Sequence, residues 1–93
     1  MKVILVYDIS TEDEGASKRL RRALQVARKY LHHVQKSVFE GELTISQIAK
    51  LKRDILKEVD RRKDSVIIYT FPEGVSIKRE ILTEAEDRTE NII

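Results

Sequence analysis

The sequence predicts a single α+β domain. Its length of 93 residues fits one domain, and 41% apolar with 37% charged residues is the composition of a globular protein rather than a disordered one. Runs rich in β-branched residues are interleaved with two segments of helical periodicity. Because a domain of this size buries only about 60% of the surface that its unfolded chain exposes, its core is modest, and a second copy would supplement it.

The first half of the sequence predicts a strand, a helix and a second strand. Residues 2–7 are a continuous apolar run, typical of a strand buried on both faces, and the short polar residues that follow favour a turn. Residues 15–31 follow the helical period, and residues 33–43 have the alternation of a strand that ends or bulges at Gly41. The apolar stripe of the helix consists of Ala16, Leu20, Ala23, Leu24, Ala27 and Leu31.

The second half predicts a helix followed by two strands. Thr44 and Gln47 have the spacing of a capping box, so we expect a helix to begin there. We expect it to end near residues 61–63, because cations favour the C-terminal end of a helix. Residues 65–71 are again β-branched or aromatic, and residues 77–82 predict a short fourth strand. The apolar side of the helix carries Ile45, Ile48, Ala49, Ile55, Leu56 and Val59.

This order of elements, β-α-β-α-β-β, predicts a ferredoxin-like fold. In its standard split arrangement it is the βαββαβ plait, an antiparallel sheet with two helices on one face. We expect this domain to cover residues 1–83, followed by an acidic connector and an apolar ending in residues 84–93. Because the plait serves many unrelated functions, the fold alone does not predict one.

The composition excludes several classes of protein. The absence of cysteine excludes disulfides and thiolate metal sites. The apolar opening is too short for a signal peptide, and no stretch approaches the ~20 apolar residues of a membrane span, so we expect a cytoplasmic protein without membrane contact. Few thermolabile residues, with abundant Ile, Lys, Arg and Glu, indicate a thermophilic source. Neither a glycine-rich phosphate motif nor a nucleophilic triad is recognisable.

Basic residues are concentrated in residues 15–36, which contain seven cations and no acid. Such a block is a candidate surface for a polyanion, although a solvated helix face would have the same pattern. The five aromatic residues do not form the base-stacking pattern of an RNA-recognition motif. We therefore expect contacts to the nucleic-acid backbone with weak sequence specificity, through the helix face opposite the apolar stripe. That face carries Lys18, Arg21, Arg22, Arg28 and Lys29, with Arg19 at its border.

Asp8 is the candidate metal ligand. It follows the first strand, where the chain leaves the sheet, and its carboxylate could equally begin an Asx-turn. Mg²⁺ prefers oxygen ligands, often one or two carboxylates with phosphates and water, so two copies of Asp8 related by a twofold axis would be an adequate site. The three acids at residues 12–14 are interpreted as solvated residues before the helix, and His32 and His33 as exposed loop residues.

Several segments, taken in order, resemble one family. They are the VYDIS strand end, the VQKSVFEGELT segment after the basic helix, the DSVIIYTF strand, and the closing REIL and ENII. Together they resemble the Cas-two family of CRISPR adaptation proteins over nearly the entire chain.

The resemblance implies a homodimer with a shared metal site. C-terminal strands would extend the partner's sheet, which would use the apolar Ile92 and Ile93, and Phe39 would lie near the dimer axis. Asp8 would be the catalytic and metal-binding residue, paired with its copy across the axis around Mg²⁺ or Mn²⁺. The basic start of the first helix, which contacts the nucleic-acid backbone in family members, is here Lys18, Arg19, Arg21 and Arg22.

The function that the resemblance implies is spacer acquisition. In the family, a central dimer bridges two dimers of the Cas-one integrase along duplex DNA. Members are also described as metal-dependent endonucleases on RNA or duplex DNA, and others as inactive. The family further resembles VapD-type ribonuclease toxins, which share the plait. The alternative function is therefore a toxin-like, metal-dependent endoribonuclease that acts without an integrase.

Overall fold

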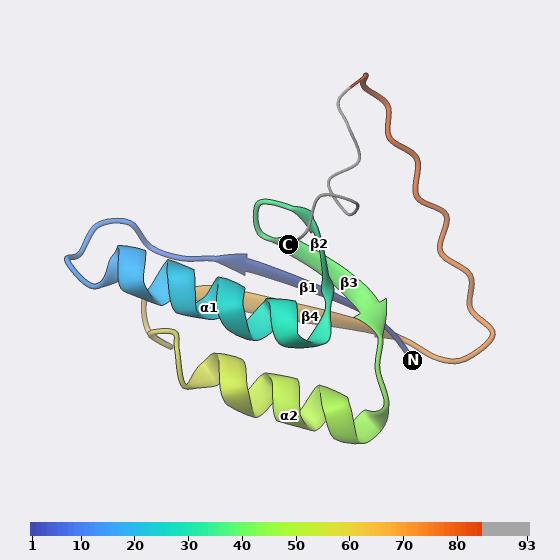
Figure 1. The fold of residues 1–93 in the computed structure, drawn as a ribbon, viewed down its shortest axis with the longest axis horizontal. Helices are drawn as coiled ribbons and strands as arrows, with labels where there is room; N and C mark the ends of the chain where they lie inside the picture. The colour runs from blue at the N-terminus through green and yellow to red at the C-terminus, as the bar shows by residue number, and fades with distance from the viewer. Residues whose placement is uncertain (85–93) are drawn as a thin grey trace.

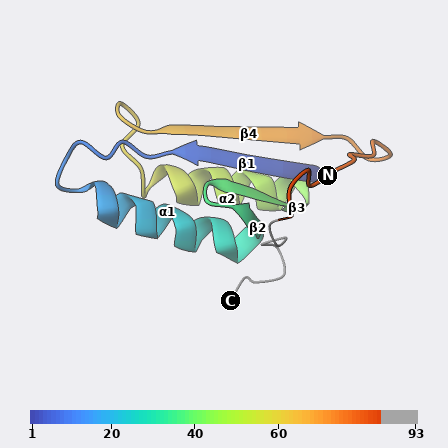
Figure 2. The same ribbon diagram turned by 90° about the horizontal axis from the view of Figure 1, so that it is seen from above.

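The structure, a computed structural model, describes residues 1–84 and confirms the ferredoxin-like fold. The four strands form one antiparallel sheet in the order β2-β3-β1-β4, and both helices lie on the same side of it (Figure 1, Figure 2). Within the described residues, no helix is long and apolar enough to cross a membrane. The elements are β1 (Lys2–Asp8), α1 (Ala16–Tyr30), β2 (His32–Gln35), β3 (Val38–Glu42), α2 (Ile45–Leu56) and β4 (Ser65–Phe71).

The predicted second strand is wrong in one respect, because residues 33–43 belong to two strands. β2 and β3 are joined by a turn at Lys36 and Ser37 and pair as an antiparallel hairpin. A register shift between His33 and Gln35 also interrupts the alternation of side chains within β2, and the sequence pattern shows neither this shift nor the turn. The hairpin supplies the pair of consecutive strands that the βαββαβ order requires.

The predicted strand at residues 77–82 is wrong for the single chain. A strand requires a neighbour with which its backbone exchanges hydrogen bonds, and none of the described strands pairs with this segment. Its apolar side chains Ile77, Ile81 and Leu82 are exposed. The fourth strand of the sheet is therefore β4, which lies at the sheet edge.

The second helix begins as predicted and ends earlier. Thr44 Oγ1 accepts from the backbone N–H of Gln47 at 3.1 Å, and Gln47 Oε1 accepts from the N–H of Thr44 at 2.9 Å, which confirms the capping box. α2 ends at Leu56, so residues 61–63 lie beyond the helix. The side chain of Asp64 accepts from the backbone N–H of Asp60 at 2.7 Å, and this bond holds the segment in turns instead.

The helices cover one face of the sheet. Val3, Leu5 and Tyr7 of β1 are buried under the helices, whereas Ile4 and Val6 are half-buried on the opposite face. The unbroken apolar run predicted that β1 is buried on both faces. That prediction is wrong, because only one face of β1 is buried. The rest of the core consists of Ile9, Ala23, Val26, Ala27, Leu31, Phe39, Leu43, Ile48, Leu51 and Ile55.

Candidate functional site

Asp8 is the last residue of β1, and its side chain is exposed. In the antiparallel register it lies opposite Ser65, the first residue of β4. Because side chains alternate along a strand, Asp8 lies on the same face as Ile4 and Val6, away from the helices. Its carboxylate is thus available at the end of the uncovered face of the sheet.

Asp8 brings one carboxylate to this end of the sheet. Among residues 1–84, no group of three or more His, Cys, Asp or Glu side chains is placed to hold a metal ion. Mg²⁺ and Mn²⁺ take oxygen ligands, often one or two carboxylates, with water and phosphate completing the coordination. Asp8 therefore fits such an ion as half of a site that a second copy completes.

The two histidines lie in β2 and not in a loop, so their interpretation as loop residues is wrong. His33 is half-buried and stacks on Phe39 with ring centroids 4.5 Å apart. Its Nε2 lies 3.0 Å from the backbone oxygen of Lys36. His32 is exposed, and as the neighbouring strand residue it points to the other face of the sheet. The two rings therefore do not converge on a shared ion.

Phe39 is fully buried within its own chain, between His33 and Tyr7. Its ring centroid lies 5.6 Å from that of Tyr7. A side chain without exposed surface cannot touch a second chain, so Phe39 is a core residue, and any effect at a dimer axis would act through β3. The other predicted axis residues, Ile92 and Ile93, lie outside the described residues.

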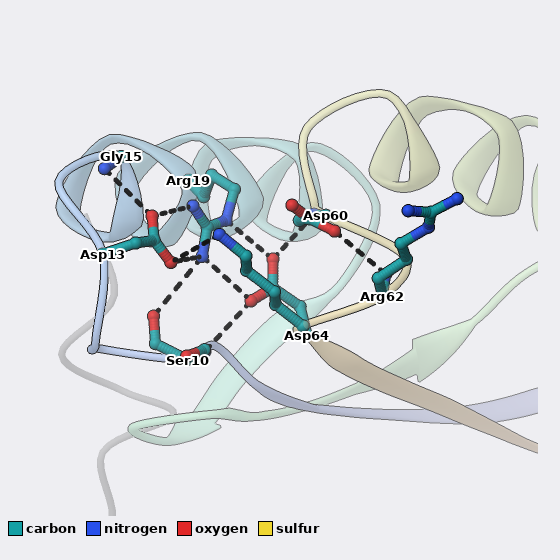
Figure 3. Close-up of polar contacts among 8 residues, drawn as sticks. Ser10, Asp13, Gly15, Arg19, Asp60, Arg62 and Asp64 are labelled. Carbon is teal, nitrogen blue, oxygen red and sulfur yellow. Dashed lines mark hydrogen bonds and ion pairs between the residues drawn. The ribbon is translucent and has the colours of Figure 1, made fainter.

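Arg19 differs from the other basic residues of α1 because two carboxylates bind its guanidinium (Figure 3). It donates to Asp13 from Nη1 at 2.6 Å and from Nη2 at 3.0 Å. It also donates to Asp64 from Nε at 2.8 Å and from Nη2 at 3.2 Å. A guanidinium held in this way has few donors left for a phosphate, so we exclude Arg19 from the nucleic-acid surface. Together with Ser10 and Asp60, these residues form what we call the Arg19 cluster.

The Arg19 cluster lowers the pKa of both acids. The hydrogen bonds from Arg19 lower the pKa of Asp13 to about 2. Burial alone would raise the pKa of Asp64, but Arg19 and the backbone N–H groups of Asp60 and Ser10 outweigh burial and lower it. The interpretation of Asp13 as a solvated acid is therefore wrong. Its partner Arg19 is six residues away across the start of α1, where no periodic pattern relates the two.

Lys18, Arg21 and Arg22 keep exposed side chains on α1. Arg22 makes a long ion pair, 3.9 Å to Glu58, and its side chain remains 47% exposed. Lys18 and Arg22 line a shallow cleft together with Lys57, between the start of α1 and the segment after α2. Arg19 and the acids Glu58 and Asp60 line the same cleft, so these exposed cations lie beside two carboxylates. Lys57 adds a position that the charge pattern of the first helix could not indicate.

The sheet face opposite the helices is apolar at its centre, and we call it the open face. Ile67 and Tyr69, its two central residues on β4, are 46% and 50% exposed. The register places them beside Val6 and Ile4 of β1. Exposed apolar patches mark interaction surfaces, and Asp8 lies at the end of this one. The open face could not be predicted from the sequence, because an unbroken apolar strand indicates burial without showing what covers each side. The central residues are Ile4, Val6, Val38, Ile67 and Tyr69.

The chain is similar in sequence and fold to proteins of one family. The family model described as CRISPR associated protein Cas2 matches residues 1–79. The chain is 50% identical over 91 residues to a CRISPR-associated endoribonuclease Cas2 2 of Moorella thermoacetica, covering 98% of this chain and 100% of that one. It is 39% identical over 93 residues to a CRISPR-associated endoribonuclease Cas2 of Fusobacterium nucleatum, covering 100% and 87%. The crystal structure of Streptococcus pyogenes Cas2 at pH 6.5 superposes with a TM-score of 0.70 at 31% identity, covering 80% of this chain and 89% of that one.

Proposed function

Because the chain belongs to the Cas2 family of CRISPR-associated proteins, we propose that it is a CRISPR adaptation protein that works as a homodimer on nucleic acid. The dimer is a scaffold that bridges the Cas-one integrase along duplex DNA in the cytoplasm, and it carries a divalent-metal site with endonuclease activity. The observation that carries this proposal is the position of Asp8 at the end of the open face.

The open face supports the dimer. Stacking two copies through it removes Ile67 and Tyr69 from water, which is favourable by roughly 25 cal/mol for each Å² of apolar surface. A twofold axis that passes near the end of β1 brings two Asp8 carboxylates together. The predicted extension of the partner's sheet by Ile92 and Ile93 concerns residues outside the described part of the chain, and among the described strands none occupies the outer edge of β4.

The paired Asp8 carboxylates are the proposed metal site. Two like charges close together repel each other, and a divalent cation between them relieves that repulsion. Mg²⁺ or Mn²⁺, when bound, supplies polarisation of a phosphoryl oxygen and a lower pKa for an attacking water. The chain itself holds the two carboxylates in place and keeps the nucleic acid near them.

The basic surface is the proposed contact for nucleic acid. Lys18, Arg21, Arg22 and Lys57 bind the phosphodiester backbone, where counterion release favours binding of any sequence. Among the described residues, the open face carries two aromatic side chains on β4, Tyr69 and Phe71, and they do not form the base-stacking pattern of an RNA-recognition motif. Binding is therefore steep in its salt dependence and weak in its sequence preference.

A second candidate function is a metal-dependent endoribonuclease that acts without an integrase, in the manner of a toxin. The relatives from Moorella thermoacetica and Fusobacterium nucleatum are both named endoribonucleases, which favours cleavage of RNA. The two functions use the same Asp8 pair and the same basic surface. They differ in whether a Cas-one partner is required.

The test is reconstitution with the Cas-one integrase from the same cell. We expect a complex that integrates short DNA duplexes. Asp8→Asn nearly preserves side-chain size, so it should keep integration and abolish metal-dependent cleavage of RNA or duplex DNA. RNA cleavage without any Cas-one complex would establish the second candidate instead. Cleavage that survives Asp8→Asn in a pure sample would exclude Asp8 as the catalytic residue.

A further inference from the structure

The Arg19 cluster joins the loop after β1 and the start of α1 to the segment before β4, which is distant in the sequence (Figure 3). The carboxylate of Asp64 accepts from the backbone N–H of Ser10 at 3.0 Å, from the N–H of Asp60 at 2.7 Å, and from Arg19. The loop after β1, the start of α1 and the segment before β4 are thereby bound to one side chain. That side chain has no exposed surface.

The cluster holds the chain on both sides of Asp8. Ser10, two residues further on, is bound at both backbone groups: its N–H donates to Asp64 Oδ1 at 3.0 Å, and its carbonyl oxygen accepts from Arg19 Nη2 at 3.4 Å. Across the sheet, Asp8 pairs with Ser65, which directly follows Asp64. The continuation of β1 and the strand neighbour of Asp8 therefore depend on the same buried carboxylate.

Arg19 and Asp64 also depend on each other. A buried carboxylate that loses its cation is strongly destabilising, because neither water nor another charge replaces it. Lys63 does not replace Arg19 as the cation bound to Asp64, since its Nζ pairs with the carboxylate of Asp13, at 3.7 Å. The planar guanidinium binds both carboxylates at once, which the single ammonium group of a lysine does not reproduce.

We propose that Arg19 and Asp64 are positioning residues for Asp8, which set the place of its carboxylate at the end of the open face. The proposal rests on the proposed metal role of Asp8. It divides the basic residues of α1 into two kinds. Arg19 fixes the loop after β1, whereas Lys18, Arg21 and Arg22 point to solvent and contact phosphate.

The first test measures amide hydrogen exchange in the full-length protein for Arg19→Lys. This change keeps the positive charge and removes the planar guanidinium group that binds both carboxylates. The backbone amides of Asp8 and Ser10 should therefore exchange faster, on the order of tenfold, whereas those of Val3 and Leu5 should exchange as in the parent. Arg28→Lys, at an exposed position on the same helix, is the matched control and should alter none of these rates. Parent-like exchange at Asp8 and Ser10 in Arg19→Lys overturns the proposal.

The second test measures binding of Mn²⁺ alone by calorimetry. The parent should bind Mn²⁺ and Asp8→Asn should not. Arg19→Lys should bind about 10–100-fold more weakly, the usual loss when a residue that supports a metal ligand is removed. Ile48→Val, which weakens the core near the start of α2 and away from the segment that carries Asp60 and Asp64, should bind as the parent does. Equal Mn²⁺ affinity in the parent and in Arg19→Lys overturns the positioning role.

Two further outcomes remain decisive. If the parent binds no Mn²⁺, the metal role of Asp8 fails, and the exchange rates of Asp8 and Ser10 alone decide whether the cluster positions this strand end.

If Arg19→Lys does not fold, Asp13→Asn replaces it as the test variant, because that variant leaves Asp64 paired with Arg19 and loosens the cluster less. Its exchange and Mn²⁺ affinity should shift in the same directions by smaller factors, and parent-like values in both overturn the proposal.

Discussion

The two faces of the sheet carry similar apolar side chains and differ in what covers them. On the helix side, Val3, Leu5 and Phe39 are each at most 1% exposed. On the open face, Ile67 and Tyr69 of the same sheet remain about half exposed. Residues 1–84 form two helices, and both lie on one side of the sheet (Figure 2). The covered face therefore stabilises the single chain, and the open face is the surface on which the proposed dimer depends.

Phe39→Ala should have the largest effect, because it opens a cavity in the covered face. Replacing a fully buried phenylalanine with alanine costs about 3–5 kcal/mol of folding stability. Urea unfolding followed by circular dichroism measures this loss. A cost below about 1 kcal/mol would mean that the core around Tyr7 and His33 collapses to fill the space, and the distinction between the two faces would weaken.

Ile67→Asp should act on the open face and leave the covered face intact. A charge placed in a stacked apolar interface should raise the dimer dissociation constant at least tenfold, which corresponds to about 1.4 kcal/mol. Sedimentation velocity over a range of concentrations measures it. Thr70→Asp is the control, because Thr70 is exposed on the same strand but its side chain alternates to the other face. Equal dissociation constants in the parent and in Ile67→Asp would exclude the open face as the interface.

Acid should loosen the edge of the covered layer where the Arg19 cluster lies. Asp13 has a pKa of about 2 and Asp64 a lowered pKa in the folded protein, against about 3.9 for an unfolded aspartate. A depressed pKa stabilises the fold above the unfolded value, and this contribution disappears as the pH falls through the folded value. Unfolding free energy should thus be level near neutral pH and decline from about pH 4 to pH 2.

Asp13→Asn tests the source of that decline, since it removes one of the two shifted carboxyls. Its stability should be lower at neutral pH and should fall less steeply in acid than that of the parent. Glu14→Gln, at an exposed acid next to it, should leave the parent profile unchanged. Parallel profiles for the parent and Asp13→Asn would assign the acid sensitivity to other carboxyls.

Lys57→Gln should have the smallest effect, on nucleic-acid binding and not on folding. Removing one phosphate contact should reduce the slope of log affinity against log salt by about one unit. Lys50→Gln, at an exposed position on α2 that does not line the cleft, is the matched control. Fluorescence anisotropy with a labelled duplex at several salt concentrations measures both. Equal slopes for the two variants would mean that overall charge, and not the cleft, governs binding.

Much of the fold could be predicted because its signals are local. The capping box at Thr44 and Gln47 depends on residues three apart, and the apolar runs of β1 and β4 identify strands without any knowledge of their neighbours. The errors arose where a neighbour decides the outcome. Residues 77–82 have the pattern of a strand but no partner strand within the described chain, and residues 33–43 turn at Lys36 and Ser37 so that their two halves pair with each other.

The candidate site divides in the same way. The sequence by itself determined that Asp8 ends the first strand and that α1 carries cations opposite its apolar stripe, because strand ends and helix faces follow from residue order. Only the tertiary structure decided that Arg19 is bound by two carboxylates, since Asp64 lies 45 residues away and the pairing of β4 with β1 brings it there. The tertiary structure also decided which sheet face stays open, because the side on which both helices pack is set by the path of the whole chain.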